Sequence, residues 1–481
     1  MAELAQANPT RRRKWLGALM VLLVGLGGIG ALTWYKLFRV VAVHYDSPLE
    51  HFKYGSVGVE APAGIPYWIW MVLPRIFPDK LDKLGGGYLA LGASWEEGQE
   101  LPIGFSKVTV GFPRVGVNCA GCHTTSVRAA AGEKPTFYFG GPANRFRPQD
   151  YLRFLFDCAR DPRFNSDTIL REIGRLYQLS WLDRLLYRYL IVPQTKRALL
   201  QTEQRDYYWM AGRPDWGPGR TDLNAIKLMV LRLPDDGTIG STDVMPIWNQ
   251  RQRQGLLHHW DGLNTTLTES VRTAALAAGA SLKSIDLDSL SRLEQWMLDL
   301  CPPPYPFSID SSLSSTGEKI YDRDCASCHT FGRARTGTAI PLAELGTDPN
   351  RNLHWSQAAA DAFNRFASGK PWAFHNFRRS EGYVATALDG LWLRAPYLHN
   401  GSVPTLKDLL EPPENRPRVF FRGYDVYDPV KVGFVSNGPQ AETEGFRYDT
   451  GLKGNGKEGH LYGTALSVSE KRALLEYLKT L

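Results

Sequence analysis

The sequence predicts a mainly α-helical protein in which one N-terminal membrane-spanning helix precedes two small helical domains with long loops. Three observations predict this architecture. Residues 15–35 carry no charge, the pattern Cys-x-x-Cys-His occurs twice, and three successive prolines stand between its two copies. A chain of 481 residues is long enough for two or three domains.

The N-terminal segment has the composition of a membrane anchor. Residues 11–14 are Arg-Arg-Arg-Lys, and the 21 residues of Trp15–Tyr35 follow them without a charge; about 20 apolar residues suffice to cross a bilayer. Basic residues on the amino side predict a cytoplasmic tail over residues 1–14 and an exported remainder. A cleaved signal peptide and a buried helix are the alternatives, but the apolar region of a signal peptide is usually only about 7–15 residues long. We therefore expect a single-pass anchor at 15–35 in a bacterial inner membrane, with the rest of the chain in the periplasm.

Residues 36–110 are predicted to wrap around the first domain. The apolar run Ile65–Leu73 is too short to span a membrane, so we expect it to pack on that domain. Val108–Val117 is predicted to be extended. An extended segment, not an amphipathic helix, therefore leads into the first Cys-x-x-Cys-His motif.

The motif Cys119-Ala-Gly-Cys122-His123 has the spacing of a c-type haem attachment site. Each cysteine can add to one vinyl group of the porphyrin, and a single helical turn presents both sulfurs to the same edge of the ring. The adjacent histidine then binds the iron as the proximal ligand. The pattern recurs as Cys325-Ala-Ser-Cys328-His329, and a zinc site built from two cysteine pairs would not need a histidine after each pair. We therefore predict two covalently bound haem c groups, each in a cytochrome c-like domain.

The first haem domain is predicted to span residues 111–301. Apolar residues at intervals of three and four predict helices over Gln149–Arg160, Ser166–Ile191 and Asp288–Leu300. The prolines of Cys301-Pro-Pro-Pro-Tyr-Pro306 cannot continue a helix, which predicts a domain boundary there.

The second haem domain is predicted to span residues 302–481. A helix over Ser314–Asp324 leads into its motif, and Ser467–Leu481 is predicted to be the terminal helix, because Ser467 and Glu470 have the spacing of a capping box. A terminal helix packed on an opening helix encloses the haem of small cytochrome c domains. The loops between these helices are expected to supply the distal wall.

Charge and cysteine content limit the partners of the chain. The net charge is +7, of which residues 1–14 supply +3, from four basic residues and one acidic residue. Four haem propionates would bring the remaining +4 close to zero, so nothing indicates a nucleic-acid partner. Two cysteines outside the motifs, Cys158 and Cys301, either form a disulfide outside the cytoplasm or remain free thiols.

Several segments outside the motifs carry a family resemblance. They are His51-Phe-Lys-Tyr-Gly-Ser56, Trp260-Asp-Gly262, Ala395-Pro-Tyr-Leu-His-Asn-Gly-Ser-Val-Pro-Thr405 and Gly454-Asn-Gly-Lys-Glu-Gly-His460-Leu-Tyr-Gly-Thr464. Together with the two motifs they resemble the bacterial di-haem cytochrome c peroxidase superfamily, and within it the branch that contains the di-haem rubber oxygenase. The resemblance covers the chain from about residue 50 to its end. It implies that His460 is the sixth ligand of the second haem, opposite His329.

No comparable sixth ligand stands out for the first haem, whose proximal ligand is His123. Met245, His258, His259 and His51 are the candidates, although packing is the simpler role for each of them. If none of them binds, the first iron keeps an open position for peroxide or dioxygen.

Three further residues are predicted to lie beside the haems. Trp260 and Asp261 are expected in the distal wall of the first haem as catalytic residues, Trp260 by packing or by assisting electron transfer. Arg394 is expected near the second haem, where its charge would balance a propionate.

Three functions remain open. The first is a peroxidase-like oxidoreductase that activates peroxide or dioxygen at the haem of His123, with electrons relayed by the second haem. The second is a haem dioxygenase of the rubber-oxygenase type, and the third is an electron-transfer cytochrome without enzymatic activity. The expected partners are the inner membrane and a small redox donor or acceptor (a cytochrome, a cupredoxin or a quinol-linked protein). A homodimer is compatible with the sequence.

Overall fold

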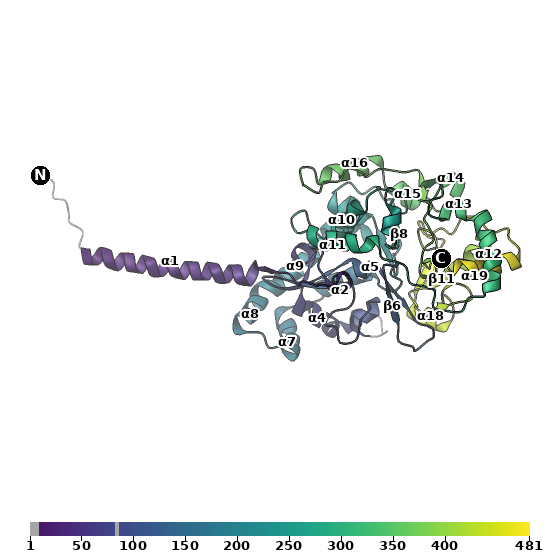
Figure 1. Cartoon of the computed structure of the whole chain (residues 1–481). Helices are drawn as coiled ribbons and strands as arrows, with labels where there is room; N and C mark the ends of the chain where they lie inside the picture. Colours follow the sequence, from purple (N-terminus) through teal and green to yellow (C-terminus); the bar gives the residue numbers. More distant parts are fainter. Residues whose placement is uncertain (1–8, 82–85) are drawn as a thin grey trace.

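A single long helix, α1 (Pro9–Leu37), projects from the body of the protein in the computed structural model, which describes residues 9–81 and 86–481 (Figure 1). Its segment Arg13–Leu37 is long and apolar enough to cross a membrane, and none of it is buried against the rest of the chain. This helix is a candidate membrane anchor or signal sequence. Residues 1–8 of the predicted cytoplasmic tail lie outside the described residues.

The body begins with a four-stranded antiparallel sheet that holds the end of α1. Its strands are ordered β1 (Val40–Val41), β3 (Phe105–Val110), β4 (Phe112–Val117) and β2 (Ile65–Pro66). The predicted extended segment is therefore confirmed, with a turn at Gly111 between β3 and β4. Gly111 has φ +71°, and a Cβ there would lie 2.3 Å from the carbonyl carbon of Leu37, so only glycine lets the hairpin turn against the end of α1.

The first core forms where helices cover this sheet. Trp70 and Leu73 of α4 (Tyr67–Ile76) are fully buried and belong to one cluster with Phe154 of α6 (Pro148–Arg160). The apolar run at 65–73 thus packs inside the body, as its length predicted. The predicted helix at 149–160 is confirmed as α6.

The prediction of a continuous helix over 166–191 is wrong, because the observed helix is interrupted. It divides into α7 (Ser166–Leu176), α8 (Trp181–Leu186) and a π-helical turn η3 (Tyr187–Ile191) that continues into α9 (Val192–Asp206). Tyr177 is extended and stacks on Trp68 at 4.3 Å, and the Ser180 side chain caps a new helix by accepting from the backbone N–H of Asp183. Apolar spacing continues across the break, so periodicity alone does not reveal it.

The second core is built on the two terminal helices that the sequence predicted. α12 (Ser311–Asp324) packs on α19 (Val468–Leu478), and Gly317 allows the close approach, because a Cβ there would meet the backbone of Ala473 at 2.0 Å. The capping box of Ser467 and Glu470 is present. α13 (Ala326–His329) follows α12 directly and carries the second motif.

Packing crosses the predicted boundary at the proline run. Trp355 and Phe363, beside α15 (Asn350–His354) and on α16 (Gln357–Phe366), share a buried cluster with Leu276 of α10 (Leu267–Ala277). The division into two haem domains therefore stays a prediction.

Two more helices, α2 (Pro48–Tyr54) and α11 (Leu287–Leu298), lie near the first motif. The helix predicted over 288–300 is confirmed as α11. The other short helices and strands are α3 (Glu60–Ala63), η1 (Pro78–Lys80), η2 (Gly87–Leu91), α5 (Cys119–Cys122), β5 (Thr124–Val127), β6 (Thr136–Phe139), η4 (Tyr208–Met210), β7 (Arg220–Asp222), η5 (Ala225–Val230), β8 (Ser241–Asp243), η6 (Gln250–Arg253), β9 (Ala339–Pro341), α14 (Leu342–Leu345), β10 (Gly382–Val384), η7 (Leu391–Leu393), α17 (Leu406–Leu409), η8 (Pro413–Asn415), β11 (Val419–Arg422), β12 (Tyr427–Asp428), β13 (Gly433–Phe434), α18 (Pro439–Glu444) and β14 (Phe446–Asp449).

Candidate functional site

In the second motif, one ring nitrogen of His329 is already hydrogen-bonded to the backbone. His329 Nδ1 lies 2.7 Å from the carbonyl oxygen of Thr386. A carbonyl only accepts, so Nδ1 carries the proton and Nε2 keeps its lone pair for a metal. Cys325 ends α12, and the backbone N–H of His329 donates to its carbonyl oxygen, so both motif cysteines and the histidine lie on one turn.

His460 faces His329 across a gap that fits one metal ion. The two ring centroids lie 6.2 Å apart. Because metal–imidazole bonds are about 2 Å long, two rings on opposite sides of one ion have centroids about 6 Å apart. Burial lowers the pKa of His329 below its ordinary value and that of His460 to about 3, so both imidazoles are in the neutral form that binds metals.

The backbone of the His460 loop is held by an arginine that the sequence analysis did not single out. Arg416 is 2% exposed and donates to five carbonyl oxygens, at distances from 2.7 to 3.2 Å: Leu409, Glu411, Lys457, Gly459 and His460. His460 has φ +47°, and its N–H donates to the Leu345 carbonyl oxygen at 2.8 Å. These bonds fix a left-handed backbone that a free loop would rarely adopt.

Arg394 lies beside the second motif, through Thr386, and its role toward a haem propionate stays a prediction. Its Nη1 donates to the carbonyl oxygen of Ala387 at 2.8 Å and its Nη2 pairs with Asp389 at 2.6 Å, while its buried Nε has no partner among the described residues. Its charge contributes to the lowered pKa of His329. One donor thus remains for an anionic group such as a propionate.

The first motif is positioned by different contacts. Asn118 caps the short helix α5 by accepting from the N–H of Ala120, and its Nδ2 donates to the carbonyl oxygens of Lys53 and Gly55 after α2. Gly104, just before β3, lets the chain pass close to the motif, because a Cβ on Gly104 would lie 2.3 Å from the Gly121 Cα. Asn118 stands directly before the motif, and this capping residue was a signal that the sequence analysis overlooked.

His123 differs from His329 in its surroundings. Among the residues that the structure describes, its buried Nδ1 has no hydrogen-bond partner, and burial lowers its pKa to about 4. Over residues 9–81 and 86–481, no other imidazole or aromatic ring lies across from it as His460 lies across from His329. The motif cysteine Cys119 instead adjoins an apolar cluster, which includes Phe52, Ala120, Phe139, Ile247, Leu267, Val271, Ala275, Leu293 and Met297.

The candidates for a sixth ligand of the first haem have other contacts. His51 Nε2 lies 3.1 Å from the carbonyl oxygen of Ser56, and His259 Nε2 lies 3.4 Å from Asn264 Nδ2. His258 lines a hollow of about 310 Å³, and Leu267 of the apolar cluster lines the same hollow. Met245 is half-buried. The hollow and the first motif therefore border the same apolar cluster.

Trp260 and Asp261 join a buried polar network, and neither hydrogen-bonds to His123. Trp260 Nε1 donates to the carbonyl oxygen of Asp243 at 2.8 Å, and Asp261 accepts from Arg351 at 3.1 Å. Asp261 is 1% exposed, its Oδ2 has no partner in the described part of the chain, and burial raises its pKa. The network continues through Asp243, which accepts from Arg422 at 2.9 Å.

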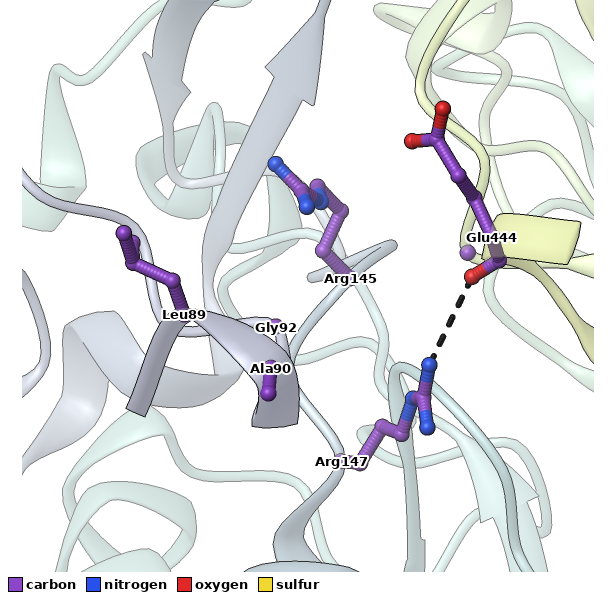
Figure 2. Close-up of a pocket in the computed structure, with 7 residues that line it drawn as sticks. Leu89, Ala90, Gly92, Arg145, Arg147 and Glu444 are labelled. Carbon is purple, nitrogen blue, oxygen red and sulfur yellow. Dashed lines mark hydrogen bonds between the residues drawn. The ribbon is translucent and has the colours of Figure 1, made fainter. Parts of the chain in front are cut away.

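A small cavity of about 20 Å³ lies between residues 89–147 and residues 423–444 (Figure 2). It has room for about one water molecule. Arg147 donates to the Glu444 carbonyl oxygen across it at 3.5 Å, and beside it the fully buried Asp425 accepts from Ser126 and Arg128, both at 2.5 Å, and pairs with Arg145 at 3.5 Å. The contact joins these two segments of the chain, and the cavity is too small for a substrate.

The donors present fit two separate haem groups. The six cysteines are free thiols, so no disulfide joins Cys158, which is buried, to Cys301, which is exposed. In the described ranges no three His, Cys, Asp or Glu side chains converge as ligands of one metal ion, and α5 and α13 lie apart (Figure 1). Each motif instead has one cysteine against an apolar cluster, a second cysteine one turn on and one neutral histidine, a set that suits an iron porphyrin.

Comparison with known proteins identifies a cytochrome segment. Residues 382–421 match the family described as RoxA-like, cytochrome c-like. The chain thus has a RoxA-like cytochrome c domain, and such a domain implies haem c. The matched segment contains Thr386, Arg394 and Arg416, the residues that contact His329 and the His460 loop.

Two proteins of Sinorhizobium fredii are similar to the chain over much of its length. The uncharacterized protein y4iM is 32% identical in an alignment that covers 52% of this chain and 66% of that protein. The uncharacterized protein y4iJ is 44% identical in an alignment that covers 76% of this chain and 77% of that protein. The chain therefore spans about two thirds of the length of the one and about three quarters of the other.

Proposed function

We propose that this chain, which belongs to the same family as y4iJ of Sinorhizobium fredii, is a membrane-anchored di-haem c-type cytochrome oxidoreductase that faces the periplasm. Peroxide or dioxygen would bind at the haem of His123, and the haem held by His329 and His460 would relay electrons. The RoxA-like cytochrome c segment supports haem chemistry, and helix α1 supports the anchor.

One observation supports different roles for the two haems, namely the difference between the surroundings of His329 and those of His123. His329 has a second imidazole across from it at 6.2 Å, whereas His123 has none among the described residues. An iron with two protein ligands on its axis has no free position for a substrate, while an iron with one keeps a position open. The hollow beside Leu267 and His258 would supply an approach to this open position.

The chain's own residues would position the groups and move protons. When bound, haem supplies the redox-active iron and an open coordination position. Reduction of peroxide to two water molecules takes two electrons and two protons; the electrons would come from a small redox protein or a quinol-linked donor. Asp261 is the candidate proton carrier, because its carboxylate is buried, its pKa is raised and one oxygen is unpartnered.

Trp260 would connect the haem of His123 to the buried polar network of Asp243 and Arg422. Its indole N–H is bound to the Asp243 carbonyl oxygen, which orients the ring, and Asp243 is in turn bound to Arg422 of β11. The network therefore links Trp260 to β11 through Asp243. A fixed aromatic ring on this path suits packing or electron transfer between the sites.

Carbon monoxide binding and electron paramagnetic resonance (EPR) spectroscopy test the proposal. In the fully reduced protein carbon monoxide should perturb one haem of the two, and His460→Ala should turn a low-spin haem into a high-spin haem with both haems still attached. His375→Ala, at an exposed histidine, is the matched control and should leave both spectra unchanged. If neither haem binds carbon monoxide, cyanide or peroxide in any reduction state, the chain is an electron carrier. An unchanged low-spin signal in His460→Ala would show that another residue is the ligand.

A further inference from the structure

An exposed apolar stripe runs along the helical segment that follows α7. Trp181 of α8 is 75% exposed, Leu185 is 44% exposed and Tyr189 of the π-helical turn is 74% exposed. Their spacing of four residues places all three on one side of this continuous helical segment. The opposite side is buried, through Tyr187 and Ile191, so the stripe is not needed to hold the helix in place.

The stripe continues onto the end of α7. Leu176 is 41% exposed and Tyr177 is 49% exposed, and Tyr177 lies flat against Trp68. Two tyrosines, a tryptophan and two leucines are thus exposed within residues 176–189. We call these five residues the aromatic face: Leu176, Tyr177, Trp181, Leu185 and Tyr189. Contiguous exposed apolar surface of this kind indicates an interaction site.

The aromatic face lies where α1 enters the body. Lys36, in the last turn of α1, pairs with Asp183 of α8 at 2.7 Å, and Asp183 is two residues from Trp181. Figure 1 shows α8 and α7 at the end of the body that α1 joins, with α19 at the far end. The apolar part of α1 ends at Leu37, so the ion pair holds α8 at the depth at which that helix would leave a bilayer.

The junction between α1 and the body is built into the sheet and leaves little freedom. Val40 and Val41 pair with β3, and the N–H of Gly111 donates to the carbonyl oxygen of Arg39 at 2.8 Å. The guanidinium of Arg39 also lies 4.1 Å above the ring of Tyr35. No linker therefore separates the body from the membrane surface, and α8 cannot move far from it.

We infer that the aromatic face rests in the headgroup region of the bilayer that α1 crosses. The inference rests on the proposed membrane anchoring and adds a second contact to it. Trp and Tyr are enriched at membrane–water interfaces, because their rings are amphipathic. Exposed Arg171, Arg175 and Arg184 lie on the same two helices, where they would meet lipid phosphates. Since the Lys36–Asp183 ion pair and the position of α8 keep the face beside the end of α1, the bilayer and not a protein partner is its occupant.

Site-specific labels on the whole haem-loaded protein in lipid vesicles test this contact. Trp181→Cys and Tyr189→Cys, each in a Cys301→Ser background, would carry an environment-sensitive fluorophore; Cys301 is the exposed free thiol outside the motifs and Cys158 is buried. Val468→Cys is the matched control, because Val468 is 87% exposed at the start of α19. The vesicles contain nitroxide-labelled phospholipids, and haem absorption verifies that each variant is folded.

The expected result is a blue-shifted emission and roughly twofold quenching at positions 181 and 189, because interfacial side chains lie about 5–10 Å into the headgroup boundary, with neither effect at 468. If the protein floats with the vesicles and all three labels behave alike, the aromatic face does not touch lipid, and the anchor stands alone. If the protein does not float with the vesicles, the proposed anchoring fails and this contact fails with it. A blue shift at 181 and 189 without quenching would show that a protein surface covers the face, which overturns the inference.

Discussion

Removing the side chain of Arg416 should release the His460 loop. Arg416→Met keeps the length of the side chain and removes its five donors, which leaves the carbonyl oxygens of Leu409, Glu411, Lys457, Gly459 and His460 without them. A hydrogen bond to a charged group is worth about 1.5–3 kcal/mol, and the bonds of one guanidinium are not additive. A buried carbonyl oxygen left without a donor costs about 1–3 kcal/mol, and we take about 3 kcal/mol as the expected loss in the free energy of unfolding.

The same loss of stability should also displace His460 from its position as a ligand of the second haem. A difference of about 3 kcal/mol lowers the ratio of ordered to released loop by more than about a hundredfold. Arg416→Met should therefore weaken the low-spin signal of the second haem, although His460 itself is still present. Thermal unfolding and EPR measure the two effects on one sample.

Arg418→Met is the matched control, because Arg418 is exposed two residues further along the chain. It should change the free energy of unfolding by less than about 0.5 kcal/mol and leave the spectrum as it was. The reasoning would be refuted if Arg416→Met behaved like this control. A loss of stability with a fully retained low-spin signal would separate the two roles and show that Arg416 supports the fold without positioning His460.

Three other predictions follow from the structure. His123→Gly should abolish turnover of peroxide or dioxygen and carbon monoxide binding at the first haem, while the low-spin signal of the second haem persists; persistence of carbon monoxide binding would place the open site elsewhere. Asp425→Asn should lower the free energy of unfolding by about 3 kcal/mol, as measured by denaturant titration, because it leaves Arg128 without its buried carboxylate; an unchanged denaturation midpoint would contradict this. Burial lowers the pKa of His399 to about 3, from 6.5 in the unfolded chain, so the unfolded chain binds more protons between these values and stability should decrease as the pH is lowered through this window. His399→Gln should flatten that part of the pH profile of stability, and an unaltered slope would show that His399 does not contribute to it.

The sequence was most informative where function depends on neighbours along the chain. Each Cys-x-x-Cys-His motif is one helical turn, and both lie on such turns, α5 and α13. The capping box of Ser467, the helix at 149–160 and the extended approach to Cys119 were also correct, because caps and periodicity act within a few residues. The apolar helix at the N-terminus was evident for the same reason.

Local patterns misled where a distant contact decided the outcome. The helix predicted over 166–191 is interrupted because Tyr177 stacks on Trp68, a residue more than a hundred positions earlier. Trp260 and Asp261 were expected beside the first haem. The structure directs them to Asp243 and Arg351, and whether they also serve the first haem stays a prediction.

The sequence by itself thus determined the covalent attachment motifs, the apolar N-terminal helix and the two helices that frame the second motif. Only the tertiary structure decided which groups face one another: His460 opposite His329, Arg416 beneath the His460 loop, and the aromatic face beside the end of α1. The physical reason is that spacing along a helix fixes distances of a few residues, whereas the distance between remote residues depends on how the cores pack. Two imidazoles far apart in the chain come to lie 6.2 Å apart only because the Leu345 carbonyl oxygen, Arg416 and Thr386 hold them there.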